Sequence, residues 1–141
     1  MTEEMKNEIL GVYENAATAL VSSVDEGGFP NTKAMLALEH DGLGVHYFST
    51  NYSARRTKQF LNNPKACVYY FKESEFRGLM LVGEMAVCTD REHRLRLWRD
   101  GFECYYPQGV DDPDYCVFKF TAQRGNYYHG LQNHDFDPNT F

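Results

Sequence analysis

The residues best suited to chemistry gather in one short stretch, Phe48 to Lys58. Arg55, Arg56 and Lys58 stand at the predicted start of a helix, where backbone N–H groups are unpaired and the helix dipole is positive. Each exposed cation at such an end is unfavourable by about 0.3–1 kcal/mol. A bound anion would relieve this repulsion, and phosphate is the usual candidate. The stretch predicts an anion site, with a solvated basic patch as the alternative.

Hydroxyl groups beside the basic residues could donate further hydrogen bonds to the anion. They belong to Ser49, Thr50 and Ser53. The glycine-rich loops that usually hold nucleotides, G-x-x-x-x-G-K-[ST] and G-x-G-x-x-G, do not occur. The phosphate could therefore belong to a nucleotide, a coenzyme or a free ion.

The composition is that of a globular protein with an acidic surface. The 141 residues suffice for one domain, residues 1–141, with 43% hydrophobic and 24% charged side chains. The net charge of −6 argues against general binding of nucleic acid or of anionic membranes. The acidic start Met1-Thr2-Glu3-Glu4 is unlike a signal peptide, so we expect a cytoplasmic protein with reduced cysteines.

The elements that must position these residues are mainly strands. Alternation and short apolar runs predict strands at 18–24, 31–38, 43–49, 65–71, 77–89 and 115–121. Helical spacing predicts helices at 2–17, 53–62 and 90–102, with Ser53 as the N-cap of the second. The connections are too short for parallel crossovers, so the pattern favours a six-stranded antiparallel barrel with peripheral helices.

Three details of these elements are specific enough to check. The nearly continuous apolar run 65–71 predicts a strand buried on both faces, with a subunit contact as one explanation. Gly83 predicts a bulge or a sharp bend in its strand. Arg91, Leu95, Trp98 and Phe102 share one face of the third predicted helix, and Trp98 is expected in the core rather than against a cofactor.

Metal ligands and nucleophilic constellations do not stand out. Cys116, His129 and His134 lack the closely paired spacing of a zinc site, and we expect no metal. The acidic residues around Pro113 are expected to form turns; they are Asp111, Asp112 and Asp114. No Ser-His-Asp or Cys-His set is evident, which fits a protein whose cofactor carries the chemistry.

The order of motifs resembles the pyridoxamine 5′-phosphate oxidase-like family of FMN-binding split barrels, and more closely its general stress protein branch. The resemblance extends from about Ala16 to about His129. Its most specific parts are Gly28-Phe29-Pro30 through Met35, Tyr47 through Arg56, and Asn62-Asn63-Pro64. It implies a mainly β, Greek-key split barrel that forms a homodimer with FMN between the subunits.

The same resemblance assigns roles to nine residues. It implies that Lys33, Arg55 and Arg56 hold the flavin phosphate, with Ser53 as a further donor. It implies that Ala34 and Met35 offer backbone groups to the isoalloxazine ring, and that Phe48, Ser49 and Thr50 line the ring and the ribityl chain. Tyr127, Tyr128 and His129 follow the last predicted strand and either cover a flavin or pack as a plain tail.

Three departures separate the chain from the true oxidases. Ala54 replaces a serine of the phosphate motif, Gly78 replaces a glutamine near the flavin, and Leu38 replaces a lysine that grips the substrate phosphate. We expect an FMN-dependent oxidoreductase that acts on another small substrate, with NAD(P)H as a possible reductant and no catalytic residue assigned. The alternatives are a non-catalytic flavin-binding, storage or stress-related protein, and a barrel that binds haem or a deazaflavin.

Overall fold

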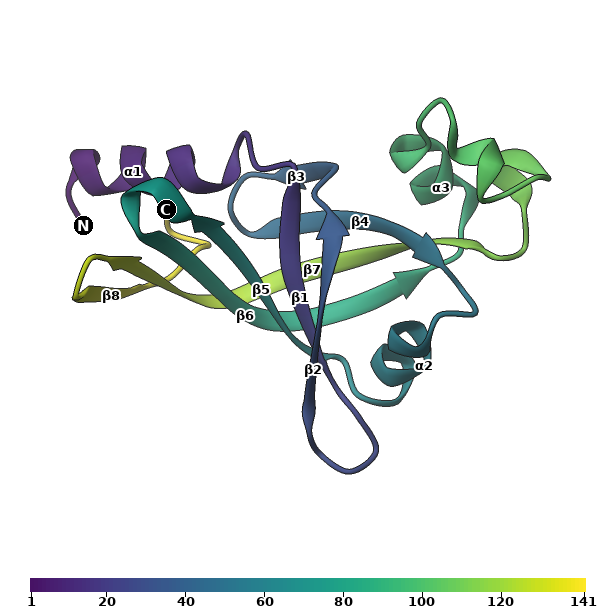
Figure 1. Cartoon of the computed structure of the whole chain (residues 1–141), viewed down its shortest axis with the longest axis horizontal. Coiled ribbons are helices and arrows are strands. Elements are labelled where there is room, and N and C mark those ends of the chain that lie inside the picture. Colours follow the sequence, from purple (N-terminus) through teal and green to yellow (C-terminus); the bar gives the residue numbers. More distant parts are fainter.

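The computed structural model describes all 141 residues, and antiparallel strands make up most of it (Figure 1). The strands are β1 (Thr18–Val24), β2 (Pro30–Leu36), β3 (Glu39–Asp41), β4 (Val45–Asn51), β5 (Lys65–Lys72), β6 (Arg77–Cys88), β7 (Tyr115–His129) and β8 (Gln132–Phe136). The α-helices are α1 (Glu3–Tyr13), α2 (Arg55–Asn62) and α3 (Arg91–Leu97). Short 3-10 turns lie at Glu73–Glu75, Phe102–Cys104 and Gly109–Asp111.

One curled sheet forms the body of the molecule, in the order β2-β1-β5-β6-β7-β4-β3, with β8 beside β7. All strand pairs are antiparallel, and several neighbours in the sheet are distant in the chain, as in a Greek key. Cα atoms of β2 and β4 approach within 8 Å without forming a ladder, so the curl is split along this line. The predicted mainly β split barrel is confirmed.

The number of strands differs from the prediction of six. β3 is a three-residue strand between the strands predicted at 31–38 and 43–49, and β8 lies beyond the last predicted strand. β7 runs to His129, well beyond the predicted end at Thr121. These segments carry few apolar residues, so their pairing depends on β4 and β7 rather than on their own hydrophobic pattern.

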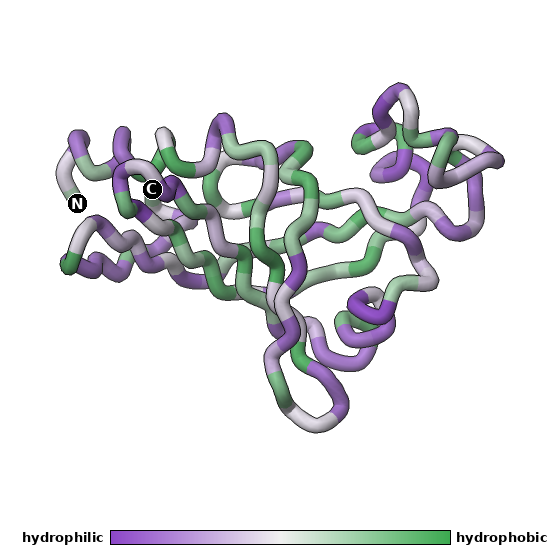
Figure 2. Tube along the Cα trace, in the orientation of Figure 1, coloured by the Kyte–Doolittle hydropathy of each residue, from purple (hydrophilic) through white to green (hydrophobic).

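Two hydrophobic clusters lie on opposite faces of β7. Cys116, Phe118 and Phe120 belong to the main core inside the curl. Val117 belongs to a smaller cluster with Leu97 and further residues of the segment around α3. Figure 2 shows that hydrophobic residues follow the central strands, whereas α2 and the outer loops are largely hydrophilic.

Several local predictions change in the structure. α2 begins at Arg55 with Ala54 as its N-cap residue, so the prediction of Ser53 as N-cap is wrong. β5 is buried on one face only, because alternate residues point outward and Phe71 remains 47% exposed. α3 ends at Leu97, and Leu95 is half-exposed while Leu97 is fully buried.

The bulge at Gly83 is confirmed. The register of β6 against β7 shifts between Val82 and Gly83. A Cβ atom at position 83 would lie 2.0 Å from the backbone oxygen of Thr121, so only glycine fits without a backbone shift. The bulge bends β6 where the sheet curls.

Candidate functional site

A hollow of about 460 Å³ opens between the β1–β2 hairpin and the start of α2. The lining residues from β1 and β2 are Val21, Ser23, Asn31, Thr32 and Lys33. Asn51, at the end of β4, the N-cap residue Ala54 and four residues of α2 complete it: Arg55, Arg56, Gln59 and Phe60. This lining carries three cations and no carboxylate, in a chain whose net charge is −6. The hollow is therefore the local exception to the acidic surface that an anion requires.

Arg56 is the most constrained cation of the hollow. Its Nη2 donates a hydrogen bond to the Thr50 hydroxyl, while its Nε is buried and has no partner. Burial lowers the pKa of the Arg56 guanidinium, because the charged form loses hydration. A buried, charge-bearing N–H group without a partner is costly, and the charge of an anion close to the guanidinium would offset this cost.

The start of α2 adds backbone donors to the same hollow. Ala54 has no side-chain oxygen, and no side chain caps the helix. No acidic residue occupies the first turn. The backbone N–H groups of Ala54 and Thr57 are already paired, with the backbone oxygens of Asn51 and Ala54. Those of Arg55 and Arg56, and the positive end of the helix dipole, are available to a ligand that lies against this helix start.

The β1–β2 hairpin places Lys33 opposite α2. Asn31 and Lys33 line the hollow from β2, and their register partners across the hairpin are Ser23 and Val21. The Ser23 hydroxyl donates to the amide oxygen of Gln59, which ties the hairpin to α2. Both walls of the hollow are therefore fixed by pairing within the chain.

The structure brings together Lys33, Arg55 and Arg56, with Thr50 behind Arg56. Ser53 is directed elsewhere: its backbone N–H and its hydroxyl both donate to the Asp114 carboxylate, at 2.8 and 3.1 Å. The Ser49 hydroxyl lies 3.3 Å from that of Tyr115, on the side of β4 that faces α3. The hydroxyls of Ser49 and Ser53 thus engage the protein, and neither residue lines the hollow.

The remaining three predicted residues lie along the same strands. The side chains of Phe48 and Met35 are buried in the main core, so either residue could touch a ligand only through its backbone. Ala34 points to the outer face of β2 and is exposed. Alternation along a strand accounts for the separation of Ala34 from Lys33 and Met35.

Sequence reasoning missed several lining residues: Val21, Ser23, Asn31, Thr32, Asn51, Gln59 and Phe60. Two signals could have found some of them. Asn31 lies two residues from Lys33, hence on the same face of a strand. Gln59 and Phe60 follow Arg55 and Arg56 by four residues, hence on the same face of a helix.

The three departures from the oxidases have structural counterparts. Ala54 lines the hollow, and Leu38 packs against the smaller hydrophobic cluster. A Cβ atom at Gly78 would lie 2.0 Å from the hydroxyl oxygen of Tyr69. A glutamine at position 78 would therefore require Tyr69 to move.

The other residues weighed in the sequence have mainly packing roles. Trp98 contacts Tyr115 edge-on, with ring centroids 5.1 Å apart, in the smaller cluster. Tyr127 is buried, and its hydroxyl donates to the carboxylate of Glu8 at 2.9 Å. His129 lies beside the same carboxylate. Asp112 accepts hydrogen bonds from two backbone N–H groups of its own loop, as a turn former does.

The longest α-helix, α1, has 11 residues, and none of the helices has the length and apolar character of a membrane span. All four cysteines are free.

Comparisons with known proteins identify the family to which the chain is similar. The family model described as pyridoxamine 5′-phosphate oxidase matches residues 5–129. The pyridoxine/pyridoxamine 5′-phosphate oxidase of Pseudomonas paraeruginosa is 31% identical over 90 residues, 64% of this chain, but that segment spans only 40% of the oxidase.

Solved structures agree with the family match. A Clostridium acetobutylicum protein related to general stress protein 26, of the pyridoxinephosphate oxidase family, is 41% identical, with 99% of each chain covered and a TM-score of 0.90. A Nostoc punctiforme protein described as related to pyridoxamine 5′-phosphate oxidase and FMN binding has a TM-score of 0.73, with 94% of this chain and 87% of that chain covered. Its 11% identity shows likeness of fold alone. The chain therefore belongs to the pyridoxamine 5′-phosphate oxidase family, in the branch related to general stress protein 26.

Proposed function

We propose that the hollow between the β1–β2 hairpin and α2 binds the phosphate of FMN, and that the chain is an FMN-binding flavoprotein. The observation that carries this proposal is the gathering of Lys33, Arg55 and Arg56 in one hollow that holds no carboxylate, at a helix start with no side-chain cap. A phosphate accepts several charge-assisted hydrogen bonds at once, so it fits this set of donors. The family and the FMN-binding Nostoc protein of the same fold favour a flavin over other phosphates.

Within this proposal the chain's residues have separate tasks. Arg56, aligned by Thr50, donates to the phosphate from the buried side, while Lys33 and Arg55 approach it from the hairpin and the helix. Bound FMN supplies reversible hydride and electron transfer. The hollow offers no histidine or carboxylate for proton transfer. An oxidoreductase reaction would therefore depend on groups outside the hollow, on the substrate or on a second subunit.

We propose that the partner is a second copy of the chain, with the flavin between the two. Support comes from the outer face of the sheet, where Leu20, Tyr69 and Met80 stand in register on β1, β5 and β6. Leu36 and Phe71 extend this apolar face and are 54% and 47% exposed. A contiguous exposed apolar face on a strand sheet is typical of a protein–protein contact. It lies on the same hairpin as the hollow, so a partner docked there would stand close to the bound cofactor.

A non-catalytic flavin carrier or sensor is the second candidate. The observation in its favour is the absence of a group that could grip a substrate phosphate at Leu38, whose side chain packs in the smaller cluster. Turnover decides between the two: an oxidoreductase consumes NAD(P)H or another reductant in steady state with a small acceptor, and a carrier does not.

The direct test is flavin binding by the purified chain. We expect the flavin absorption bands, either as purified or after titration with FMN, and a one-to-one ratio of FMN to chain. A chain that takes up no flavin contradicts the proposal, and a haem spectrum would identify another ligand of the same barrel.

Two variants locate the phosphate. Arg56→Ala should weaken FMN binding by about 1.5–3 kcal/mol, because it removes a charge-assisted contact. Arg91→Ala is the matched control, since Arg91 is an exposed arginine paired with Asp111 outside the hollow. Riboflavin, which has no phosphate, should bind wild type and Arg56→Ala with similar affinity. An Arg56→Ala variant that binds FMN as the wild type does would refute the assigned role.

A further inference from the structure

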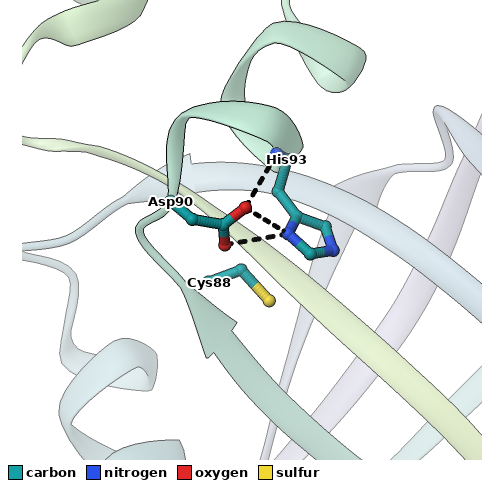
Figure 3. A group of neighbouring side chains, drawn as sticks. All are labelled: Cys88, Asp90 and His93. Atoms are coloured by element: carbon teal, nitrogen blue, oxygen red, sulfur yellow. Dashed lines mark hydrogen bonds and ion pairs between the residues drawn. The ribbon is translucent and has the colours of Figure 1, made fainter.

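A second cluster of reactive side chains lies where β6 passes into α3, outside the hollow (Figure 3). It consists of Cys88, Asp90 and His93, each of which offers one donor atom within 4.8 Å of the other two. Nδ1 of His93 lies 2.8 and 2.7 Å from the two carboxylate oxygens of Asp90. The three donors are a thiol sulfur, a carboxylate oxygen and an imidazole nitrogen, all of which are common zinc ligands.

The local structure brings the three donors together and fixes two of them, Asp90 and His93, against each other. Cys88 is the last residue of β6 and Asp90 is the N-cap residue of α3. The carboxylate of Asp90 accepts the backbone N–H of His93 at 3.1 Å, so one helical turn brings the two ligands together. Tyr47 packs beside the imidazole, with ring centroids 6.1 Å apart. The cluster therefore joins a strand end to a capped helix, which reduces the entropy lost on binding an ion.

We propose that Cys88, Asp90 and His93 bind a thiophilic divalent cation of the zinc class, with the fourth position open to water or another ligand. The thiol proton leaves to solvent when the metal–sulfur bond forms, so thiolate and carboxylate together balance the two positive charges. Two ligands at tetrahedral zinc stand about 3.3 Å apart, given metal–ligand distances of about 2.0–2.1 Å. Asp90 and His93 must separate by only about half an ångström to reach this spacing, and both side chains are at least partly exposed.

The consequence of binding would be structural as well as chemical. The cation would tie the end of β6 to α3, whose Leu97 is a fully buried member of the smaller cluster. Residues 91–114 contain only one α-helix and two short 3-10 turns, so this tie would stabilise a segment with little regular structure. Sequence reasoning weighed Cys116, His129 and His134 as metal ligands and did not predict the spacing Cys-x-Asp-x-x-His.

The plain alternative is a capping pair in which Asp90 binds His93 and Cys88 is a bystander. Metal binding by the purified full chain decides between the two. We expect one zinc ion per chain in a competition titration with a chromophoric chelator. Cobalt(II), added to the same preparation and read as a difference spectrum, should show a thiolate charge-transfer band and visible bands of tetrahedral intensity.

Variants assign the ligands. Cys88→Ser and His93→Gln should each weaken zinc binding roughly ten-fold or more, and Cys88→Ser should abolish the thiolate band. Asp90→Asn keeps an oxygen that caps α3 while it removes the charge, and should also weaken binding. Cys104→Ser and His134→Gln are matched controls outside the cluster and should bind as wild type does.

Two outcomes overturn the proposal. One is that the wild-type chain binds less than one zinc ion; the other is that Cys88→Ser and His93→Gln bind zinc as tightly as the wild type does. Because these two variants leave the Asp90 cap intact, they keep the test decisive even if Asp90→Asn does not fold. FMN binding should be unchanged in all three variants, so failure here is distinguishable from failure of the proposed flavin site.

Discussion

At the scale of single residues, the side chains of the site are sorted by strand alternation. Thr50 and Ser49 are neighbours on β4, yet Thr50 accepts a hydrogen bond from Arg56, whereas Ser49 faces Tyr115 and Leu97. The family resemblance assigns both hydroxyls to the cofactor. The contacts support a role in cofactor binding only for Thr50, and this role is to align Arg56 rather than to touch the cofactor.

This difference yields a prediction with a built-in control. Thr50→Val removes the oxygen that aligns Arg56 and should weaken FMN binding by about 1 kcal/mol, which is roughly a five-fold rise in Kd. Ser49→Ala should leave FMN affinity unchanged. Titration by flavin fluorescence measures both, after chemical denaturation has shown that each variant is folded. Equal losses of FMN affinity in the two variants would mean that Ser49 contributes to flavin binding as much as Thr50 does.

At the scale of elements, β6 depends on a close approach at its bulge. The backbone oxygen of Thr121 occupies the place that a side chain at Gly83 would take. We expect Gly83→Ala to destabilise the fold by about 1–3 kcal/mol or more, because backbone must move to admit the methyl group. Gly11→Ala in α1 is the control: nothing lies within 4 Å of the position that its methyl group would take, and alanine should stabilise the helix by roughly 0.5–1 kcal/mol. Urea unfolding of both variants measures the two changes in the free energy of unfolding. A Gly83→Ala variant as stable as the wild type would contradict the close approach at the bulge.

The elements also show how far the sequence alone leads. The succession of short strands with tight connections was enough to predict the barrel, and the charges at the start of α2 were enough to predict Arg55 and Arg56 at an anion site. Lys33 was expected only from the family resemblance, and Lys58, predicted beside the two arginines, lines a neighbouring hollow instead. Ser23 and Gln59 were out of reach, because their meeting depends on the hairpin docking against α2. β8 was missed because it owes its place to pairing with β7 and not to an apolar face of its own.

At the scale of the whole molecule, a buried histidine links stability to pH. His46 is fully buried; its Nε2 donates to the backbone oxygen of Leu43 at 2.8 Å, and its Nδ1 accepts from Tyr70 at 2.9 Å. Burial lowers the pKa of His46 to about 4, with a smaller effect of nearby His40 in the same direction. The folded protein therefore holds the imidazole neutral where the unfolded chain would protonate it.

The free energy of unfolding should therefore fall as the solution becomes more acidic. The contribution of His46 to stability is complete above about pH 6.5 and is lost as the pH falls toward 4, by about 3 kcal/mol in total. His46→Gln can keep both hydrogen bonds and should be less sensitive to pH over this interval than wild type. Denaturant unfolding across the interval measures the difference, with His134→Gln, outside the core, as a control that keeps the wild-type slope. An identical slope in His46→Gln would show that other groups cause the acid sensitivity.

Assembly is the remaining property of the whole molecule, and we propose that the outer face of the sheet mediates it. Phe71 lies 6.2 Å from Tyr69 and 5.8 Å from Phe76, between ring centroids, on the face that we propose as the subunit contact. Phe71→Glu would bury a carboxylate against apolar side chains and should convert a dimer to monomers in light scattering at micromolar concentration. Leu131→Glu is the control, because Leu131 is 94% exposed in the turn between β7 and β8 and should leave the dimer intact. If the flavin lies between subunits, Phe71→Glu also lowers FMN affinity. A dimer that survives Phe71→Glu would place the contact on another face of the barrel.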